Sequence, residues 1–256
     1  MFYFSSNGSY SLQHVHREAL KAWLTCDFDH TYSLFYTDIF MEYGKDTHRY
    51  KDCVVKKNGN ENINSRMQRC KQDLKAACLN SKVILVKTIR TPMKMVLSLM
   101  NEVTDLKVIN LVRDPRSTLS SKLMISGCHD GLKPCAHEYC RQVEEDGQAK
   151  EQAVAYRDNI LTVTYEDIAR TPVKVSSVMY QFMNMTFPQS NAEYVFNITV
   201  AGDRSNCDVC RQYWQLGNDT ESSLNHIDSW KHTMSKNIIS VIEDICHRVM
   251  KMYHYS

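Results

Sequence analysis

The stretch 107–123 constrains the fold most, because its pattern is that of a strand that passes directly into a helix. Residues 107–112 (Lys-Val-Ile-Asn-Leu-Val) are mostly apolar and rich in β-branched residues, which is typical of a buried strand. Asp114 is a suitable N-cap and Pro115 suits the first helical position, so a helix is predicted to follow at once. In an open α/β sheet such a junction lies at the edge where ligands bind, and the N–H groups of a helix start favour an anion.

The same junction carries side chains that suit a phosphate. Arg113 offers a planar, two-pronged donor, and Ser117 and Ser121 lie four residues apart on one helical face. The alternative is that Arg-Asp-Pro-Arg is only a capped, solvated helix start without a ligand.

Strands and helices alternate along the chain, which predicts an α/β fold with a parallel sheet and right-handed crossovers. Strands are expected at 82–87, 107–112 and 159–164. Helices are expected at 12–24, at 64–78 with Asn64 as the cap, at 92–100, from 115 onward, at 172–183 and at 238–250. We expect residues 1–256 to form a single domain.

Composition limits the classes of protein to consider. With 43% hydrophobic and 23% charged residues, the chain as a whole is globular rather than disordered. A formal net charge of +2 gives no reason to expect nucleic-acid binding, so an anionic ligand would need a local basic patch. No apolar run approaches the roughly 18 residues of a membrane span, and no signal segment is visible at the start of the chain.

Cysteines and glycosylation sequons point to the secretory lumen. The chain has 10 cysteines, an even number, and sequons begin at Asn7, Asn184, Asn197 and Asn218. Against this, cysteines can be reduced core residues, and sequons arise by chance. The missing signal means that the protein is either cytosolic or lacks its true amino terminus in this chain.

Three cysteines with interleaved histidines raise the question of a zinc site. Cys128, Cys135 and Cys140 alternate with His129 and His137, but none of these cysteines forms the compact Cys-x2-Cys pair of closed zinc sites. Disulfides are therefore preferred, and no metal is expected. The segment 207–210 has that pair spacing without a second matching pair, so a disulfide is expected there too, with its partners open.

Several stretches together resemble the carbohydrate sulfotransferases that use 3′-phosphoadenosine 5′-phosphosulfate (PAPS), in the group that modifies O6 of Gal, GlcNAc or GalNAc. The junction at 107–123 is similar to the 3′-phosphate-binding segment of that family, with a Ser eight residues after the first Arg. The stretches 11–28, 87–90, 165–183 and 230–252 are similar to further family segments, in the family's order. The resemblance runs, with gaps, from about residue 11 to about residue 252.

The resemblance implies a fold, an activity and a location. The fold would be a P-loop-like, three-layer α/β structure with a central parallel sheet flanked by helices. Arg113 and Ser121 would hold the 3′-phosphate of PAPS, the co-substrate that donates the sulfate, and sulfate would pass to a hydroxyl of a glycan or proteoglycan without a metal. The family consists of type II membrane proteins of the Golgi lumen, so contact with a membrane would come only through an anchor that this chain lacks.

Two pairs of charged residues remain open to two interpretations. Glu166 and Asp167 are adjacent acids at a strand end that could serve acid–base chemistry, although we favour a structural role. Lys87 and Arg90 close the expected strand 82–87 and either face the substrate cleft or form its solvated end.

One family element has no counterpart in the sequence. The family wraps the 5′-phosphosulfate in a strand-Arg-(Ser/Thr)-Gly-(Ser/Thr)-Ser loop and places a Glu-Pro pair soon after it, and none of the 8 glycines lies in such a setting. We therefore expect an N-terminally incomplete fold, without the first strand, loop, helix and anchor, and no catalytic base is assigned. A truncated gene model, a splice form and a decayed copy would all give this pattern.

Three functions are compatible with these features to different degrees. The leading one is a lumenal carbohydrate 6-O-sulfotransferase. The second is a non-catalytic protein that keeps only the site for the 3′-phosphate half of the nucleotide. A small-molecule kinase would need a Gly-x4-Gly-Lys-(Ser/Thr) loop, which the sequence lacks.

Overall fold

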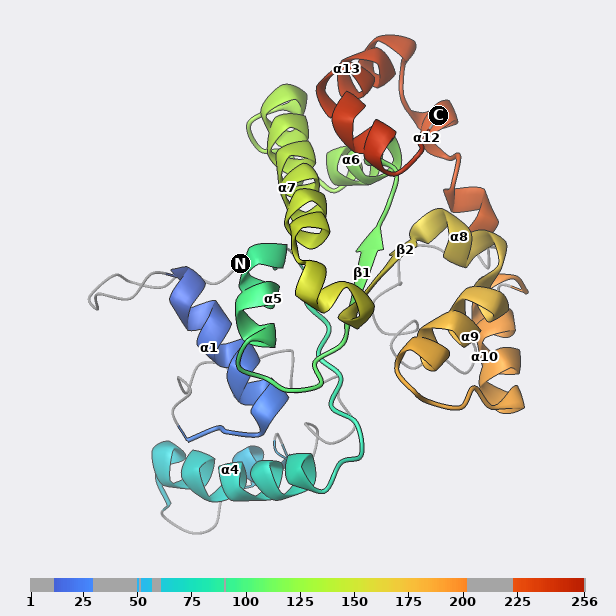
Figure 1. Ribbon diagram of the computed structural model, residues 1–256. Coiled ribbons are helices and arrows are strands. Elements are labelled where there is room, and N and C mark those ends of the chain that lie inside the picture. The colour runs from blue at the N-terminus through green and yellow to red at the C-terminus, as the bar shows by residue number, and fades with distance from the viewer. Residues whose placement is uncertain are drawn as a thin grey trace. The chain divides into compact units, whose positions relative to one another are not determined.

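A computed structural model describes residues 12–29, 50, 52–56, 61–89, 91–201 and 223–255 (Figure 1). The chain divides into two compact units. The first comprises Met1–Thr91 and Ser98–Thr104, and the second comprises Pro92–Leu97 and Asp105–Ser256. The division falls within helix α5 (Met93–Met100), which confirms the helix expected at 92–100.

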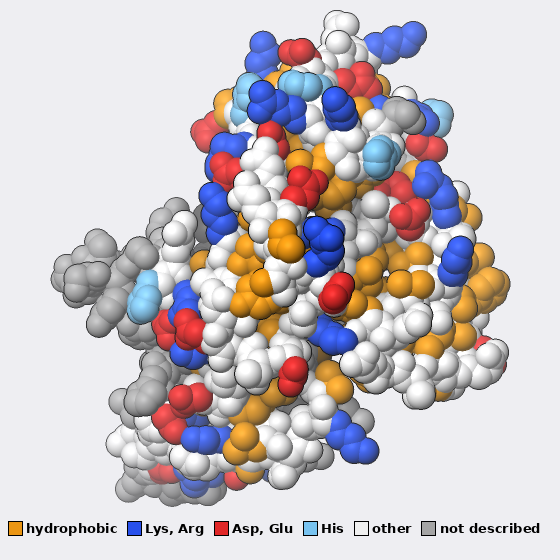
Figure 2. Space-filling view, viewed as in Figure 1, with side chains coloured by type: hydrophobic (Ala, Val, Ile, Leu, Met, Phe, Trp, Pro, Cys, Tyr) orange, Lys and Arg blue, Asp and Glu red, His pale blue; other side chains and the backbone are white. Residues whose placement is uncertain are grey.

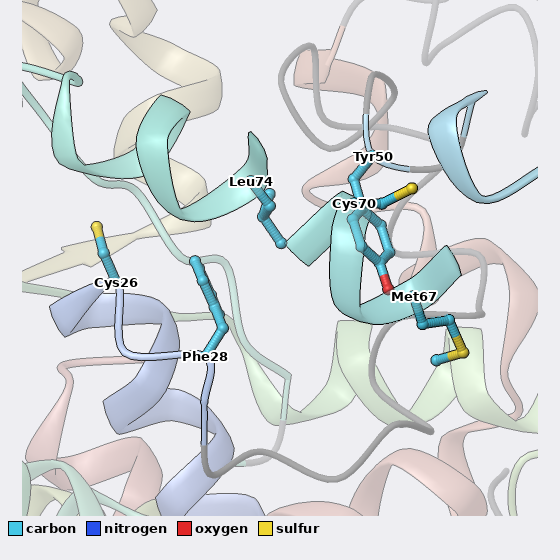
Figure 3. Packing of buried hydrophobic residues seen from close by; sticks show 6 residues of the cluster. All are labelled: Cys26, Phe28, Tyr50, Met67, Cys70 and Leu74. Carbon is cyan, nitrogen blue, oxygen red and sulfur yellow. The ribbon is translucent and has the colours of Figure 1, made fainter. Parts of the chain in front are cut away.

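The first unit is built on two helices and two disulfides. Helix α1 spans Leu12–Thr25 and helix α4 spans Ile63–Leu79. One buried cluster joins α4 to the residues that follow α1 and to Tyr50, which lies beside α4 (Figure 3); its members are Cys26, Phe28, Tyr50, Met67, Cys70 and Leu74. The disulfides Cys26–Cys78 and Cys53–Cys70 tie the two helices and the segment around Tyr50 together. Covalent links of this kind compensate for a small core.

Helix α4 begins slightly earlier than the sequence suggested. Its cap is Asn62 rather than Asn64, because the Asn62 side chain accepts a hydrogen bond from the Ser65 N–H at 2.9 Å. Both asparagines precede the apolar periodicity, so pattern alone could not choose between them.

The prediction of a strand at 82–87 was wrong. Residues 83–88 have no regular secondary structure, and most of their side chains are exposed, with Leu85 at 80%. A strand needs a neighbour for its backbone N–H and C=O groups, and no segment in the described part of the chain pairs with this one. Lys87 is thus exposed on an irregular segment rather than at a strand end, and Arg90 lies outside the described residues.

The second unit contains the parallel sheet. Strand β1 (Val108–Val112) pairs in parallel with β2 (Ile160–Thr164), in a register that sets Val112 opposite Thr164. Within the described ranges these two strands make up the whole sheet. The parallel sheet, and both strands expected at 107–112 and 159–164, are therefore confirmed in a mostly helical α/β structure.

Helices surround and connect these strands in the second unit. The crossover from β1 to β2 consists of α6 (Pro115–Met124), α7 (Leu132–Gln152) and the 3-10 helix η2 (Val154–Asn159). After β2 come α8 (Tyr165–Arg170), α9 (Pro172–Phe182), α10 (Gln189–Thr199), the 3-10 helix η3 (Ser223–His226), α12 (Trp230–Thr233) and α13 (Lys236–Met252). The expected helices from 115, at 172–183 and at 238–250 are confirmed.

The core of the second unit lies where α6, α7 and α13 meet. Its buried members are Leu119, Ala136, Cys140, Ile242, Cys246 and Val249. Helices α7 and α13 approach closely at Gly147, where a Cβ would collide with Met252 Sδ and lie 2.9 Å from the Tyr253 hydroxyl. A larger residue at position 147 would therefore require the Met252 and Tyr253 side chains to move.

Disulfides account for the cysteines of this unit that the structure describes. Cys128 pairs with Cys135, and Cys140 pairs with Cys246 across α7 and α13. The expectation of disulfides is confirmed for these residues, while the expectation for 207–210 falls outside the described residues. No helix in the described segments has the length and apolar character needed to cross a membrane.

Candidate functional site

Arg113 follows the last residue of β1 and is held by groups from distant parts of the chain. Its guanidinium carbon lies 4.2 Å from the centroid of the Tyr165 ring, and its Nη2 donates to the carbonyl of His226 at 3.1 Å. Its Nε is buried and has no hydrogen-bond partner among the described residues. Stacking on an aromatic ring fixes the plane of a guanidinium without neutralising its charge.

The second arginine of the motif has a different role. Arg116 is buried, and its guanidinium forms ion pairs with Asp114 and Glu243, both at 2.7 Å. It also stacks on the Trp230 ring, at 4.2 Å from the centroid. Arg116 thus joins α6, α12 and α13, and its charge is compensated by two carboxylates. Arg113 makes no such ion pair within the described ranges, so its charge remains available to an anion.

Asp114 behaves as the sequence predicted. Its side chain accepts a hydrogen bond from the Arg116 N–H at 2.8 Å and so caps α6. The cap fills the position at the helix start that an anion would otherwise take. Any anion at this junction would therefore depend on the side chain of Arg113 more than on the end of the helix.

The two serines of α6 differ in exposure. Ser121 is half-buried, and its hydroxyl donates to the Ser117 carbonyl at 3.1 Å. The Ser117 hydroxyl is fully buried, with no partner in the part of the chain that the structure describes. Of the two, only Ser121 is partly exposed, and its hydroxyl must turn away from the Ser117 carbonyl before it can donate to a ligand. The described residues contain no hydrogen bond between Ser121 and Arg113.

The buried carboxylate of Glu166 supports the junction through hydrogen bonds. Glu166 accepts the Asp114 backbone N–H at 3.1 Å through one oxygen, and the Tyr255 hydroxyl at 3.2 Å through the other. Asp167 instead accepts the Thr164 hydroxyl at 2.8 Å, while its own N–H donates to that hydroxyl at 3.1 Å. Both acids therefore hold local structure, in agreement with the structural role that we favoured.

Replacing Tyr255 with Phe is expected to destabilise the second unit. The variant loses a hydrogen bond to a charged group, which is worth about 1.5–3 kcal/mol, and it leaves one oxygen of the buried Glu166 without its donor. Urea denaturation of the purified protein measures this change in the free energy of unfolding. Tyr253→Phe is the matched control, because the described residues show no hydrogen bond from the Tyr253 hydroxyl; an equal loss in both variants would contradict the assignment.

The pH dependence of this contact has a definite sign. Burial raises the pKa of Tyr255 far above its usual range, and the charge of Glu166 adds to the rise. Because the pKa is raised in the folded state, the contact gives its full stabilisation below the pKa of the unfolded state, about 10. This stabilisation is lost as the pH rises through the pKa of the folded state. The difference between wild type and Tyr255→Phe should thus be constant at neutral pH and shrink in strongly alkaline solution.

Sequence reasoning missed the aromatic residues that frame the junction. Tyr165 lies under Arg113, and the Tyr139 hydroxyl lies 3.4 Å from the Arg113 carbonyl and 3.3 Å from Thr118 Oγ1. The register of the sheet supplies the missing signal for Tyr165: Val112 is opposite Thr164, and Arg113 and Tyr165 are the residues that directly follow the two strands. No comparable signal in the sequence marks Tyr139 or Tyr255.

No metal site accompanies this junction in the described ranges, where no group of three or more His, Cys, Asp or Glu residues could hold an ion. The arrangement consists of the Arg113 guanidinium without an ion-pair partner among the described residues, the half-buried Ser121 hydroxyl, and Glu166 hydrogen-bonded to the backbone at Asp114. Such a set can bind the oxygens of a phosphate by charge-assisted hydrogen bonds.

Comparison with known proteins gives related sequences but no solved structure that matches. The chain is 25% identical over 224 residues to carbohydrate sulfotransferase 3 of Tetronarce californica, which covers 78% of this chain and 48% of the relative. It is 26% identical over 199 residues to carbohydrate sulfotransferase 1 of Danio rerio, and the match covers 70% of this chain and 46% of the relative. For carbohydrate sulfotransferase 3 of Homo sapiens the identity is 24% over 174 residues, and the match covers 59% of this chain and 34% of the relative.

The chain spans about half the length, or less, of the curated relatives that it matches. A model of the protein family described as "Sulfotransferase family" matches residues 10–189, well over half of the chain, and the match includes β1, α6 and β2. This match establishes that the chain belongs to the sulfotransferase family.

Proposed function

We propose that this chain is the catalytic region of a carbohydrate sulfotransferase that moves sulfate from PAPS to a hydroxyl of GlcNAc, Gal or GalNAc in a glycan or proteoglycan. Family membership and the names of the relatives support a sulfotransferase that acts on carbohydrate. The family match runs through parts of both compact units, which supports one sulfotransferase-like domain over residues 1–256. The observation that carries the proposal is the uncompensated, stacked guanidinium of Arg113 at the end of β1.

The chemistry assigns a clear task to this guanidinium. The oxygen of the sugar hydroxyl forms a bond to sulfur while the bond from sulfur to the 5′-phosphate oxygen breaks, the hydroxyl proton passes to a general base, and adenosine 3′,5′-bisphosphate leaves. Such a transfer depends on holding donor and acceptor in line. In the proposal Arg113 binds the 3′-phosphate in two-pronged fashion and Ser121 donates a further hydrogen bond, so that the nucleotide is fixed at the end remote from the reacting sulfur.

The proposed location is the Golgi lumen. Four disulfides among the described cysteines support an oxidising compartment, because thiols stay reduced in the cytosol. The four sequons of the sequence are consistent with passage through the secretory pathway.

Replacing Arg113 with Ala tests the site directly. We expect the variant to bind adenosine 3′,5′-bisphosphate about 10- to 150-fold more weakly, the equivalent of a charge-assisted contact of about 1.5–3 kcal/mol. Isothermal titration calorimetry on the full 256-residue chain measures this difference. Arg170→Ala, which removes an exposed arginine from the last turn of α8, should leave the affinity unchanged.

A second ligand makes the test specific to the 3′-phosphate. Wild type should prefer adenosine 3′,5′-bisphosphate to adenosine 5′-monophosphate, and Arg113→Ala should lose that preference. Ser121→Ala should reduce this preference less than Arg113→Ala does, because the Ser121 hydroxyl gives up its bond to the Ser117 carbonyl when it donates to the phosphate. Equal affinity of wild type for both nucleotides would overturn the assignment of Arg113 and Ser121.

A second candidate function is a nucleotide-binding protein that performs no transfer. The observation that favours it is the lack, anywhere in the sequence, of a glycine loop suited to the 5′-phosphosulfate. An assay with labelled PAPS and acceptors that end in GlcNAc, Gal or GalNAc separates the two candidates. Labelled glycan supports the transferase, whereas nucleotide binding that depends on Arg113 without any transfer supports the binding protein.

A further inference from the structure

Arg66, on helix α4 of the first unit, is a buried cation without a partner. The residue is only 7% exposed, and its Nε is buried and accepts no contact from a hydrogen-bonding group. Among the described residues, no hydrogen bond or ion pair holds its guanidinium. Because burial of a charge costs free energy unless another group compensates it, a cation in this position calls for an anion.

The packing around Arg66 leaves only the end of the side chain open. Arg66 precedes Met67 in the chain and lies one helical turn before Cys70, and both of these residues belong to the buried cluster of the first unit (Figure 3). Unlike Nε, the two terminal nitrogens of the guanidinium are not buried. A long cationic side chain at a surface usually keeps its whole charged head in water. Here the head is recessed, and only its two prongs reach the surface.

The acid nearest in the chain is already engaged by another arginine. Arg69 donates to Glu61 through Nη2 at 3.1 Å and through Nε at 3.3 Å. These hydrogen bonds hold the pKa of Glu61 below its usual range, and the charge of Arg66 adds a weaker effect in the same direction without a hydrogen bond. Two guanidiniums thus share one carboxylate, which leaves one positive charge in excess.

The surroundings do not form a broad basic patch. Figure 2 shows Lys and Arg side chains interspersed with Asp and Glu on the visible face of the molecule, and the formal net charge of the whole chain is only +2. An anion at Arg66 would therefore be attracted by this one recessed guanidinium rather than by a field of many charges.

We propose that Arg66 forms a second anion site, which binds a carboxylate of the acceptor glycan. The planar fork of a guanidinium matches the two oxygens of a carboxylate, and a single negative charge balances the single positive charge in excess. The phosphosulfate of the nucleotide carries more negative charge, which the nearby Glu61 would repel more strongly. The inference rests on the carbohydrate acceptor in the proposed function. It adds that the acceptor is an acidic glycan, with a uronic acid in addition to the sugar that receives sulfate.

Calorimetry with a matched pair of oligosaccharides tests this site. One is a hexasaccharide of alternating glucuronate and GalNAc, and the other is the same hexasaccharide with each carboxylate reduced to a hydroxymethyl group. The full chain, saturated with adenosine 3′,5′-bisphosphate, should bind the acidic form at least about 10-fold more tightly, because the reduced form cannot make a charge-assisted contact. Arg66→Met should lose this preference. Lys82→Met, which removes an exposed positive charge from the same unit, should keep it.

The results separate failure of this inference from failure of the proposed function. Equal affinity of wild type for the two oligosaccharides, or a preference that persists in Arg66→Met, would overturn the second anion site. The proposed function would stand in that case if nucleotide binding still depended on Arg113. Weaker nucleotide binding by Arg66→Met would assign the anion to the nucleotide and overturn the glycan carboxylate. A chain that binds neither the nucleotide nor the oligosaccharides would overturn both proposals.

Stability measurements give an independent test. Since the guanidinium of Arg66 has no partner to lose, Arg66→Met should be at least as stable as wild type in urea denaturation without ligand. The acidic hexasaccharide should raise the urea midpoint of wild type more than that of Arg66→Met, because it binds the folded wild type more tightly. A clear loss of stability in Arg66→Met without ligand would show that Arg66 supports the fold instead, and would overturn the site.

Discussion

Arg116→Met is expected to destabilise the protein by about 3–5 kcal/mol, because it breaks a buried ion pair by removing one partner. The side chain of Arg116 is only 5% exposed, and that of Asp114 is 8% exposed. The variant leaves the Asp114 carboxylate buried without its cation, and it removes the stacking on Trp230. Urea denaturation followed by tryptophan fluorescence measures the loss.

An exposed arginine provides the control for this prediction. Arg141 on α7 also pairs with two carboxylates, Glu138 and Glu145, but its side chain is 52% exposed. Water screens such pairs, so Arg141→Met should cost no more than about 1 kcal/mol. Similar losses for Arg116→Met and Arg141→Met would show that burial does not govern the strength of these pairs.

A double variant separates the lost pair from the stranded charge. Asp114→Asn combined with Arg116→Met removes both charges and keeps a side chain that can cap α6. It should be more stable than Arg116→Met alone, since no charge remains buried without a partner. A double variant that is less stable than the single one would contradict this account.

Removal of the Cys140–Cys246 disulfide is expected to have the other large effect. Its two cysteines are 106 residues apart in the chain and lie in the buried core of α7 and α13. In the chain-entropy account, the link lowers the conformational entropy of the unfolded state. For a loop of about 100 residues this stabilises the folded state by about 4.7 kcal/mol. The Cys140→Ala/Cys246→Ala variant should lose stability on that scale in a denaturation experiment.

The second disulfide on α7 is the natural control. Cys128 and Cys135 are separated by only 7 residues, so the same account gives the loss of their link a smaller cost of about 2 kcal/mol. Both double variants replace two cysteines with Ala and both alter α7. The prediction is contradicted if the Cys128/Cys135 variant is the less stable of the two.

The sequence predicted those elements whose signals are local. Asp114 and Pro115 mark the start of α6 through chemistry within one helical turn, and the structure has that cap. The segment 82–87 carries an equally clear strand pattern and yet forms no strand, because pairing depends on a neighbour that the segment itself cannot specify. The start of α6 was thus predictable from a few residues, whereas the fate of an apolar segment such as 82–87 depends also on whether a partner strand lies beside it.

The sequence predicted the central residue of the candidate site but not the residues that support it. Arg113 follows from the strand-to-helix pattern, but its supports come from Tyr165 and His226, which are 52 and 113 residues further along the chain. Glu166 was visible as an acid at a strand end, although nothing local indicates its bond from Tyr255. Spacing could not predict the pairing of Cys140 with Cys246 either, because many connectivities fit ten cysteines.

The pairing of Cys140 with Cys246 also has a consequence for biosynthesis. A ribosome that adds roughly 5–20 residues per second needs about 5 to 20 seconds to translate the 106 positions from Cys140 to its partner. During that interval Cys128 and Cys135, only a few residues apart, are already available to the Cys140 thiol for incorrect pairing. Correct maturation of the chain therefore requires that the Cys140 thiol stays unpaired, or that an early incorrect bond is exchanged, until Cys246 has been translated.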